Sequence, residues 1–327
     1  MNKFAKSLIQ SQITGPFAAS MVVAILVTLT TERFLEVNNL GNLALQISIV
    51  SLMAIGSTIV ILTGGIDLSP GSMIALLTMV FAEFIKFGHI SLPVAILLIL
   101  VLGSFLGAIN GFLTAYVRIP SFITTLAGLS AYRGMAFMFN NGSPIFSVSD
   151  SLDGLFYYKF LGVPMPFFYV VFFFALAGLV MRYTRLGRHI YAVGGNAAAS
   201  KLSGINVEQT QLFAFAIAGL MAAVASILMA ARLNSGSPNY GVGMELQAIA
   251  AAVIGGASLS GGRGNIISTF FGALTIVIVQ NGLNLNAVPT SLQNIIIGLI
   301  ILLAVVIDIW REEMGIVFRR LIPSRNP

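Results

Sequence analysis

Long apolar runs are the feature that most constrains this chain, because several approach the length that spans a bilayer as a helix. Roughly 20 apolar residues are needed for such a span. Only 9% of the 327 residues are charged and 57% are hydrophobic, whereas soluble domains carry about 25% charged residues. A soluble core cannot hide this much apolar surface, so lipid is the expected solvent. The runs are continuous rather than alternating, which favours helices over a β-barrel.

The chain is therefore predicted to be an all-α polytopic membrane protein with about ten transmembrane helices, in a single domain over residues 1–327. The ten segments lie near residues 17–31, 43–62, 72–87, 92–116, 121–139, 166–183, 209–231, 246–257, 266–283 and 292–310. Two segments are poor spans. The stretch 246–254 gives only about 14 Å of helix at 1.5 Å per residue, and 72–87 is short and starts at a glycine/proline break.

The distribution of basic residues favours one orientation, with both termini cytoplasmic. With ten crossings, twelve of the 17 basic residues fall inside, four fall outside, and Arg133 lies within a span. Cytoplasmic loops normally carry such an excess, so the net charge of +6 does not indicate nucleic-acid binding. Residues 1–16 are expected to form a cytoplasmic tail, because lysines precede the first apolar run without a convincing cleavage site.

Several kinds of chemistry have no residues to support them. There are no cysteines, which excludes disulfides, thiolate catalysis and cysteine-ligated metals. His89 and His189 show no metal-site spacing. No paired carboxylates, Ser/His/Asp set or phosphate-binding G-x-x-x-x-G-K-[ST] pattern is present. We expect no catalytic residue, no metal and no cofactor bound by this chain.

A glycine-rich sequence occurs twice, as GGIDLSPG at 64–71 and GGASLSGG at 255–262. Five residues match at a constant offset of 191, which predicts two related halves with short or broken helices at these motifs. Unwound backbone survives in a membrane only where it faces protein or a water-filled cavity, and paired interruptions of this kind indicate a transport pathway. The alternative is that both motifs are ordinary cytoplasmic turns. Ser69-Pro70 has the form of an N-cap followed by a first-turn proline.

Polar residues in or near the spans are candidates for lining a pathway, although amides in lipid also bond across helices as structural contacts. Gln280 and Asn284 lie one helical turn apart and share a face. A neutral, amide-rich lining suits an uncharged, hydroxylated solute. Arg133 is either functional, as intramembrane ionisable residues commonly are, or a snorkelling or capping residue. The candidate pathway residues are Gly64, Gly65, Asp67, Ser69, Asn110, Gly255, Gly256, Ser258, Gln280, Asn281 and Asn284.

The stretch 190–207, IYAVGGNAAASKLSGINV, is a polar island between two long apolar runs. Arg182, Arg185 and Arg188 precede it, and its small residues are expected to pack closely. Because the chain is otherwise mostly apolar, this polar segment is the place where a soluble partner is expected to bind.

At GGNAAASKLSGINV the chain resembles the permease subunits of bacterial ATP-binding-cassette importers of the ribose-type branched family. Similarity at 62–73, 121–134 and 251–265 extends the resemblance to nearly the whole chain. Ala197 stands where many relatives have glutamate, which leaves the role of that position open. The residues that match the coupling motif are Gly194, Gly195, Asn196, Ala198, Ala199, Ser203, Gly204 and Ile205.

The resemblance implies a mechanism and a set of partners. Residues 184–208 would form a cytoplasmic coupling loop that inserts into an ATPase subunit, which binds ATP and Mg²⁺ in place of this chain. Two permease copies, or a copy and a homologue, would form a central pathway in the bacterial inner membrane. An external binding protein would deliver ribose or a similar monosaccharide. The external segment 140–165 is then either its docking surface or a plain extended linker.

Two other classes of function fit the residues less well. A secondary transporter of a small polar solute, driven by an ion gradient, needs titratable or ligating groups at depth. Asp67, Glu83, Glu245 and Asp308 are expected towards the ends of spans, which argues against that class. A membrane enzyme is disfavoured because no catalytic constellation is present.

Overall fold

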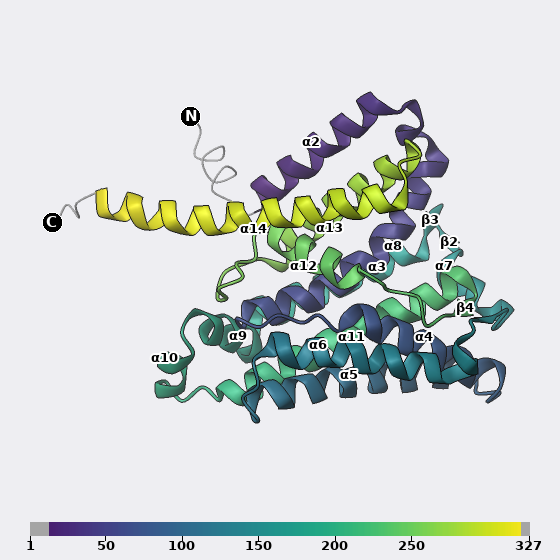
Figure 1. Ribbon diagram of the computed structural model, residues 1–327, viewed down its shortest axis with the longest axis horizontal. Coiled ribbons are helices and arrows are strands. Elements are labelled where there is room, and N and C mark those ends of the chain that lie inside the picture. The colour runs from purple at the N-terminus through teal and green to yellow at the C-terminus, as the bar shows by residue number, and fades with distance from the viewer. Residues whose placement is uncertain (1–12, 322–327) are drawn as a thin grey trace.

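The structure is a computed structural model that describes residues 13–321, with side chains described as far as residue 310, and it is almost entirely helical (Figure 1). Six helices are long and apolar enough to cross a membrane. They are α3 (Val37–Leu62), α5 (Leu92–Ala115), α8 (Met165–Tyr183), α11 (Val207–Leu233), α13 (Ile266–Leu285) and the first 21 residues of α14 (Thr290–Leu321). The predicted all-α membrane class is therefore confirmed.

The remaining four predicted segments also coincide with helices, namely α2 (Thr14–Thr30), α4 (Pro70–Lys86), α6 (Ser121–Met138) and α12 (Met244–Ile254). Helix α12 has 11 residues and so extends about 17 Å, little more than half of the hydrocarbon thickness. Its shortness was predicted. Because only six of the described helices satisfy both length and hydropathy, ten full crossings remain a prediction.

The helices run between two ends of the molecule, which carry different structures (Figure 1). At the first, called here the α9–α10 end, lie α9 (Arg185–Gly195), α10 (Ala197–Leu202) and the start of α2. At the opposite end, called here the strand end, β1 (Ile145–Phe146) pairs with β4 (Ser235–Gly236), and β2 (Lys159–Phe160) pairs with β3 (Val163–Pro164). The strand end also holds α7 (Asp153–Phe156) and the short 3-10 helices η1 (Glu32–Leu35), η2 (Phe139–Gly142) and η3 (Asp150–Leu152).

The predicted external segment 140–165 is folded onto the strand end. Its Leu152 and Phe156 side chains are completely buried, and Ile145 is 2% exposed. Ile145 also faces Gly236 across the β1–β4 ladder, which ties the segment to the chain after α11. The plain-linker alternative is therefore wrong, because an extended linker would bury none of these side chains. A docking role for the segment remains a prediction.

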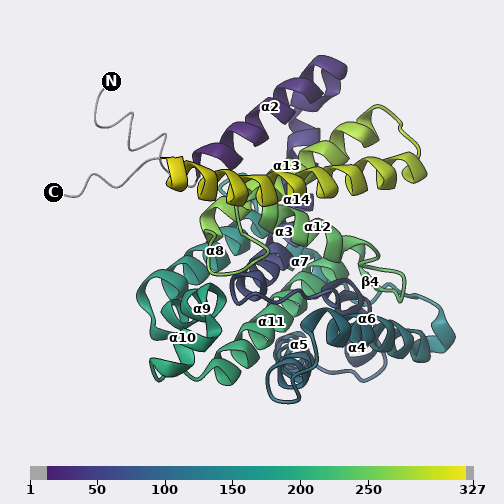
Figure 2. The same ribbon diagram turned by 60° about the vertical axis from the view of Figure 1, so that its left-hand side comes forward.

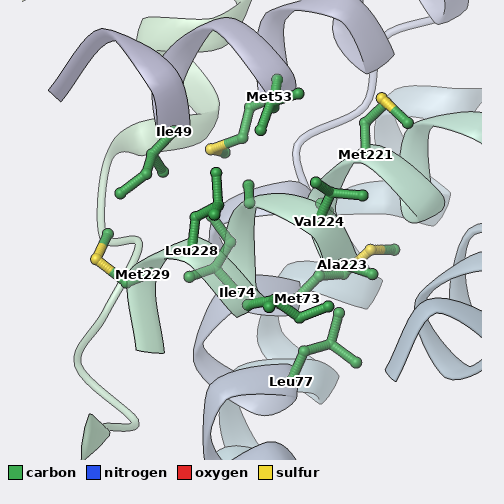
Figure 3. Close-up of a cluster of buried hydrophobic side chains, with 14 of the residues drawn as sticks. Ile49, Met53, Met73, Ile74, Leu77, Met221, Ala223, Val224, Leu228 and Met229 are labelled. Atoms are coloured by element: carbon green, nitrogen blue, oxygen red, sulfur yellow. The ribbon is translucent and has the colours of Figure 1, made fainter. Parts of the chain in front are cut away.

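Helices α3 and α11 form the centre of the fold, and α2 and α14 lie at its edge (Figures 1 and 2). Within the most apolar window of each helix, 89% of α3 is buried and only 11% of α14. Figure 3 shows the core where α3, α4 and α11 meet, with Met53, Met73 and Met221 among its side chains. The outer helices α2, α5, α8 and α14 expose large apolar side chains, as lipid-facing helices do.

Glycines allow α5 and α11 to approach closely along their length. A Cβ atom on Gly219 of α11 would overlap the carbonyl oxygen of Gly103 and lie 2.9 Å from the Cα of Gly107, both in α5. Small residues at helix crossings permit such backbone contact in membranes. This contact holds α11, the helix that directly follows the coupling segment, against α5.

Candidate functional site

The predicted coupling segment 184–208 consists of two short helices rather than an irregular loop. The Thr184 hydroxyl accepts a hydrogen bond from the Gly187 N–H at 3.2 Å and caps α9. The Asn196 Oδ1 accepts one from the Ala199 N–H at 2.9 Å and caps α10. Such side-chain caps satisfy donors that a helix start leaves unpaired. Asn196 thus has a local role in ending α9 and starting α10.

Most of the predicted coupling residues lie on the exposed surface of α10 and the turn that follows it. The sequence reasoning missed Leu202, whose side chain is 91% exposed at this tip. A large apolar side chain held almost fully in solvent is available for contact with another molecule. The exposed members of the predicted set are Gly195, Asn196, Ala198, Ala199, Ser203 and Gly204, whereas Gly194 and Ile205 are half-buried.

Gly194 lies where the coupling segment meets both glycine-rich motifs. A Cβ atom there would overlap the Leu62 carbonyl oxygen and lie 2.5 Å from the Gly262 nitrogen. The Gly262 N–H in turn donates to the Leu62 carbonyl at 3.0 Å. A Cβ atom on Gly261 would lie 2.9 Å from both the Gly194 oxygen and the Gly64 nitrogen. We call this contact of residues 62–64, 194–195 and 261–262 the glycine junction.

The expectation of close packing holds at Gly194 but fails at Gly204. A Cβ atom on Gly204 would meet nothing within 4 Å, and the residue has φ +81°. Its requirement for glycine is therefore conformational, because side-chain residues rarely adopt such backbone angles. Gly195 is also open, because a Cβ atom there would meet nothing within 4 Å and its φ is not positive. The backbone of both Gly194 and Gly195 contacts the glycine-rich motifs, but of these two only Gly194 leaves no room for a side chain.

The two glycine-rich motifs are side by side, but their structural correspondence differs by one residue from the sequence alignment. The turn that follows α3 has Gly64 at φ 81°, and Gly65 N–H donates back to the Val60 carbonyl. The turn that follows α12 has Gly256 at φ 90°, and Ala257 N–H donates back to the Ala252 carbonyl. Both ends follow the same helix-terminating hydrogen-bond pattern. Gly64 therefore corresponds to Gly256, and not to Gly255 as the sequence match predicts.

Three predicted pathway residues beside the first motif form one buried hydrogen-bond chain. The Tyr132 hydroxyl donates to Asn110 Oδ1 at 3.0 Å, Asn110 Nδ2 donates to Ser69 Oγ at 2.9 Å, and Ser69 Oγ donates to Asp67 Oδ1 at 2.7 Å. Ser69 is the N-cap residue of α4 and Pro70 occupies the first turn, as predicted, but the Ser69 side chain makes no cap bond and is used in this hydrogen-bond chain instead. Asp67 is 2% exposed, and its Oδ2 has no hydrogen-bond partner among the described residues.

The predicted residues of the second motif contact other helices and take no part in the Tyr132–Asn110–Ser69–Asp67 hydrogen-bond chain. Ser258 Oγ lies 2.9 Å from Ser260 Oγ and donates to Asp308 Oδ2 of α14 at 3.3 Å. A Cβ atom on Gly255 would lie 2.6 Å from the Cα of Thr269, so this glycine permits close packing of α12 on α13. The second motif is thus anchored to α13 and α14, and the first to α5 and α6.

The predicted amide face of α13 divides between two surroundings. Gln280 and Asn284 line one cavity of about 410 Å³, as their spacing predicts. Asn281 points elsewhere and exchanges two hydrogen bonds with Asn39 of α3, at 2.9 and 3.0 Å. Paired and buried in this way, Asn281 has the surroundings of a helix-packing residue and does not line the cavity.

Arg133 and Glu245 lie beside the segment that precedes α12. From the sequence, the role of Arg133 stays open between a functional residue and a snorkelling or capping one, and Glu245 is expected towards the end of a span. Arg133 Nη1 of α6 donates to the carbonyls of Pro238 and Tyr240, both at 2.6 Å. It thereby holds the non-helical segment that precedes α12. Glu245, in the first turn of α12, places its carboxylate against the Gly71 backbone of α4, and its Oε2 has no hydrogen-bond partner within the described part of the chain.

Comparison with known proteins identifies the class to which this fold and these motifs belong. Residues 39–305 match the family described as the branched-chain amino acid transport system / permease component. The chain is 41% identical to the ribose import permease protein of Escherichia coli (strain K12) over 294 residues, which cover 89% of this chain and 91% of that protein.

Two other relatives have similar coverage. Identity is 40% over 299 residues with the ribose import permease protein of Bacillus subtilis (strain 168), covering 91% of this chain and 92% of that protein. It is 36% over 360 residues with the xylose transport system permease protein of Escherichia coli (strain K12), covering 91% of each. No solved structure matches. The chain belongs to this family of transport permeases, which are not catalytic subunits, and the predicted resemblance is confirmed.

Proposed function

We propose that this chain forms the membrane pathway of an importer for ribose or a similar monosaccharide, driven by ATPase subunits that bind at the α9–α10 end. The observation that carries the proposal is the position of α10. Its tip exposes Leu202, and Gly194, at the end of α9 just before the Asn196 cap of α10, contacts both glycine-rich motifs. A partner that presses on α10 can therefore act on the end of α3 and on residues 261–262 of the loop that follows α12. ATP and Mg²⁺ bind the partner subunit in this proposal.

The charges at the two ends support a cytoplasmic position for α9–α10, in a multi-pass protein of the bacterial inner membrane. Cytoplasmic loops carry an excess of Lys and Arg. Both described ends of the chain, the start of α2 and the far part of α14, lie at the same end as α9–α10 (Figure 1). Among residues 13–310, the basic residues at the α9–α10 end are Arg118, Arg182, Arg185, Arg188, Lys201 and Arg263, and the acidic ones are Glu208 and Asp308. The basic residues at the strand end are Arg33, Lys86, Lys159 and Arg232, and the acidic ones are Glu32, Glu36, Glu83, Asp150 and Asp153.

The strand end then faces outward and receives the sugar-loaded binding protein. The β2–β3 hairpin exposes Tyr158, Phe160 and Leu161, the last at 86%, on a segment that is anchored through buried Leu152 and Phe156. Exposed aromatic side chains on a rigid support are typical of protein interfaces. A second copy of this chain, or a homologue, completes the pathway in the proposed assembly.

Two matched substitutions at opposite ends test this assignment. Leu202→Asp and Leu161→Asp each place a charge on an almost fully exposed leucine, so neither is expected to change the free energy of unfolding by more than about 0.5 kcal/mol. Leu202→Asp should abolish co-purification of the ATPase and leave capture of the binding protein intact. Leu161→Asp should do the reverse. If Leu202→Asp retains both the ATPase and full ATP-driven uptake, α10 is not the docking element.

A secondary transporter driven by an ion gradient remains the second candidate, because the structure buries two acids that the sequence analysis expected towards span ends. Within the described residues, Asp67 Oδ2 and Glu245 Oε2 are buried without hydrogen-bond partners. Buried carboxylates can bind protons or cations during transport. Under this alternative, Asp67→Asn or Glu245→Gln would abolish sugar uptake driven by a proton or sodium gradient without any ATPase present.

A further inference from the structure

The cavity lined by Gln280 and Asn284 is built from four helices and carries an unusual set of side chains. It lies between α3, α11, α12 and α13 and measures about 410 Å³, within the range of small-molecule sites. Helices α3, α12 and α13 each contribute side-chain amides to its lining, and α11 contributes none. We call the set Gln46 of α3, Asn239, Gln247 of α12, Gln280 and Asn284 the amide cup.

The three glutamine carboxamides of the cup are unpaired. In the part of the chain whose side chains are described, the amide groups of Gln46, Gln247 and Gln280 have no hydrogen-bond partner, although each can donate two bonds and accept two. Gln247 is also only 9% exposed. The Asn39–Asn281 pair shows what happens when amides serve to pack helices, because each satisfies the other. Their amide atoms face the cavity rather than being sealed off, and Gln46 and Gln280 are half-buried, so water hydrates them when the cavity is empty and a solute that displaces this water must replace its hydrogen bonds.

The chemistry of the walls selects the occupant. Among the described residues no carboxylate lines the cup, and the one charged side chain there is Arg232. An amino acid would bring an ammonium group without an anionic partner, which is unfavourable in a desolvated site. A neutral polyol both donates and accepts hydrogen bonds, as carboxamides do. The Tyr240 side chain forms part of the cavity lining, and its hydroxyl shares a hydrogen bond with the Ser235 hydroxyl, with the two oxygens 2.6 Å apart.

From these observations we infer that the amide cup is a sugar-binding station within the pathway, in which Gln46, Gln247 and Gln280 bind the hydroxyl groups of the passing monosaccharide. This inference rests on the proposed function and adds the residues that recognise the solute. Asn284 differs from the three, because its Oδ1 already accepts a hydrogen bond from Gln293 at 2.9 Å.

The position of the cup connects it to the coupling end. Its floor includes Ile49 and Met229, which belong to the α3–α11 core in Figure 3. Gln247 lies near the start of α12, and the other end of α12 leads into residues 261–262 of the glycine junction. Movement of α10 can therefore shift α12 and change the grip on the sugar. Arg133 supports the same wall through the carbonyls of Pro238 and Tyr240.

The absence of cysteine in the natural chain gives a direct test. Gln46→Cys, Gln247→Cys and Gln280→Cys are made singly in the full importer in membrane vesicles, and a small, membrane-impermeant thiol reagent is added on the strand-end side. All three should be labelled, and D-ribose or D-xylose should slow labelling by about fivefold or more, whereas L-leucine should not. Gln211→Cys, on α11 at the opposite end, is the control: it is labelled from the α9–α10 side in inverted vesicles, and the sugars should leave its labelling unchanged.

Labelling that no sugar slows at any of the three positions overturns the inference, as does a cup that the reagent cannot reach. If Gln247→Cys fails to fold, the half-buried Gln46 and Gln280 still decide the result. Because labelling and its protection need no ATP, failure of ATP-driven uptake would count against the proposed function without removing the cup.

Substitutions to leucine give an independent readout of recognition. Gln247→Leu and Gln280→Leu remove hydroxyl partners, so the preference for D-ribose over 2-deoxy-D-ribose should fall by about tenfold, equivalent to 1.4 kcal/mol. Gln211→Leu is the matched control and should retain the preference. An unchanged preference in both cup variants would contradict a role in recognising the sugar.

Discussion

The two ends of this molecule are held together in different ways. At the α9–α10 end, backbone meets backbone at the glycine junction, where Gly194 leaves no room for a side chain. At the strand end, side chains do the holding, as Arg133 bonds two carbonyls and Asn234 accepts hydrogen bonds from two N–H groups of the 140–165 segment. The first arrangement is a close backbone contact suited to transmitting a displacement, whereas the second leaves a cavity lined by amide side chains. In the proposed function, coupling and recognition are therefore assigned to opposite ends of the molecule.

The largest effect is expected from a substitution that breaks the glycine junction. Gly194→Val places a side chain onto the Leu62 carbonyl, so ATP-driven uptake should be lost and the free energy of unfolding should fall by about 1–3 kcal/mol. Gly195→Val is the adjacent control, because a Cβ there meets nothing within 4 Å. Thermal unfolding of purified protein and uptake in vesicles measure both effects. Equal tolerance at the two positions would contradict a tight junction.

A large effect is also expected at the other end from Arg133→Gln. Loss of the charged donor frees the Pro238 and Tyr240 carbonyls, and hydrogen bonds to charged groups contribute about 1.5–3 kcal/mol each. Sugar uptake should fall by about tenfold or more, while ATPase capture at α10 should persist. Arg133→Lys should recover part of the loss. Normal uptake by Arg133→Gln would show that the segment ahead of α12 needs no such support.

The Asn39–Asn281 pair should affect stability without affecting the choice of solute. Asn281→Leu leaves the buried Asn39 Oδ1 without a donor, while Asn39 Nδ2 still donates to the Phe34 carbonyl at 2.9 Å; the cost is about 1–3 kcal/mol, and the double variant with Asn39→Leu should recover much of that loss. Sugar preference should stay unchanged throughout. Denaturation midpoints and competition uptake assays provide the two readouts. A changed sugar preference in Asn281→Leu would show that this residue does contribute to the pathway.

The smallest effect is expected from the ion pair between Lys201 and Glu208 at the coupling segment. The charged atoms are 3.3 Å apart, and the Lys201 side chain is 65% exposed, so solvent and salt screen the pair. Lys201→Met should change the unfolding free energy by less than about 1 kcal/mol. A calorimetric shift larger than that would mean that the pair organises α10.

The sequence was sufficient to predict the helical segments, the shortness of α12, and the shared surroundings of Gln280 and Asn284, because hydropathy and helical periodicity are local properties. It was not sufficient to place Asn281, since its partner Asn39 is 242 positions away. Repeat alignment assigned Gly255 to Gly64, whereas helix termination selects Gly256, because both motifs have two adjacent glycines that could end a helix. Gln247 was missed because its place in the lining of the cavity is visible only in three dimensions.

Reconstitution of the purified chain tests the central claim most directly. Liposomes containing this chain, its ATPase and its binding protein should accumulate radiolabelled D-ribose only when ATP is supplied to the side carrying α9–α10. Liposomes containing the chain alone should accumulate none under a proton or sodium gradient. Gradient-driven accumulation by the chain alone, abolished by Asp67→Asn, would contradict the account and establish the ion-driven alternative.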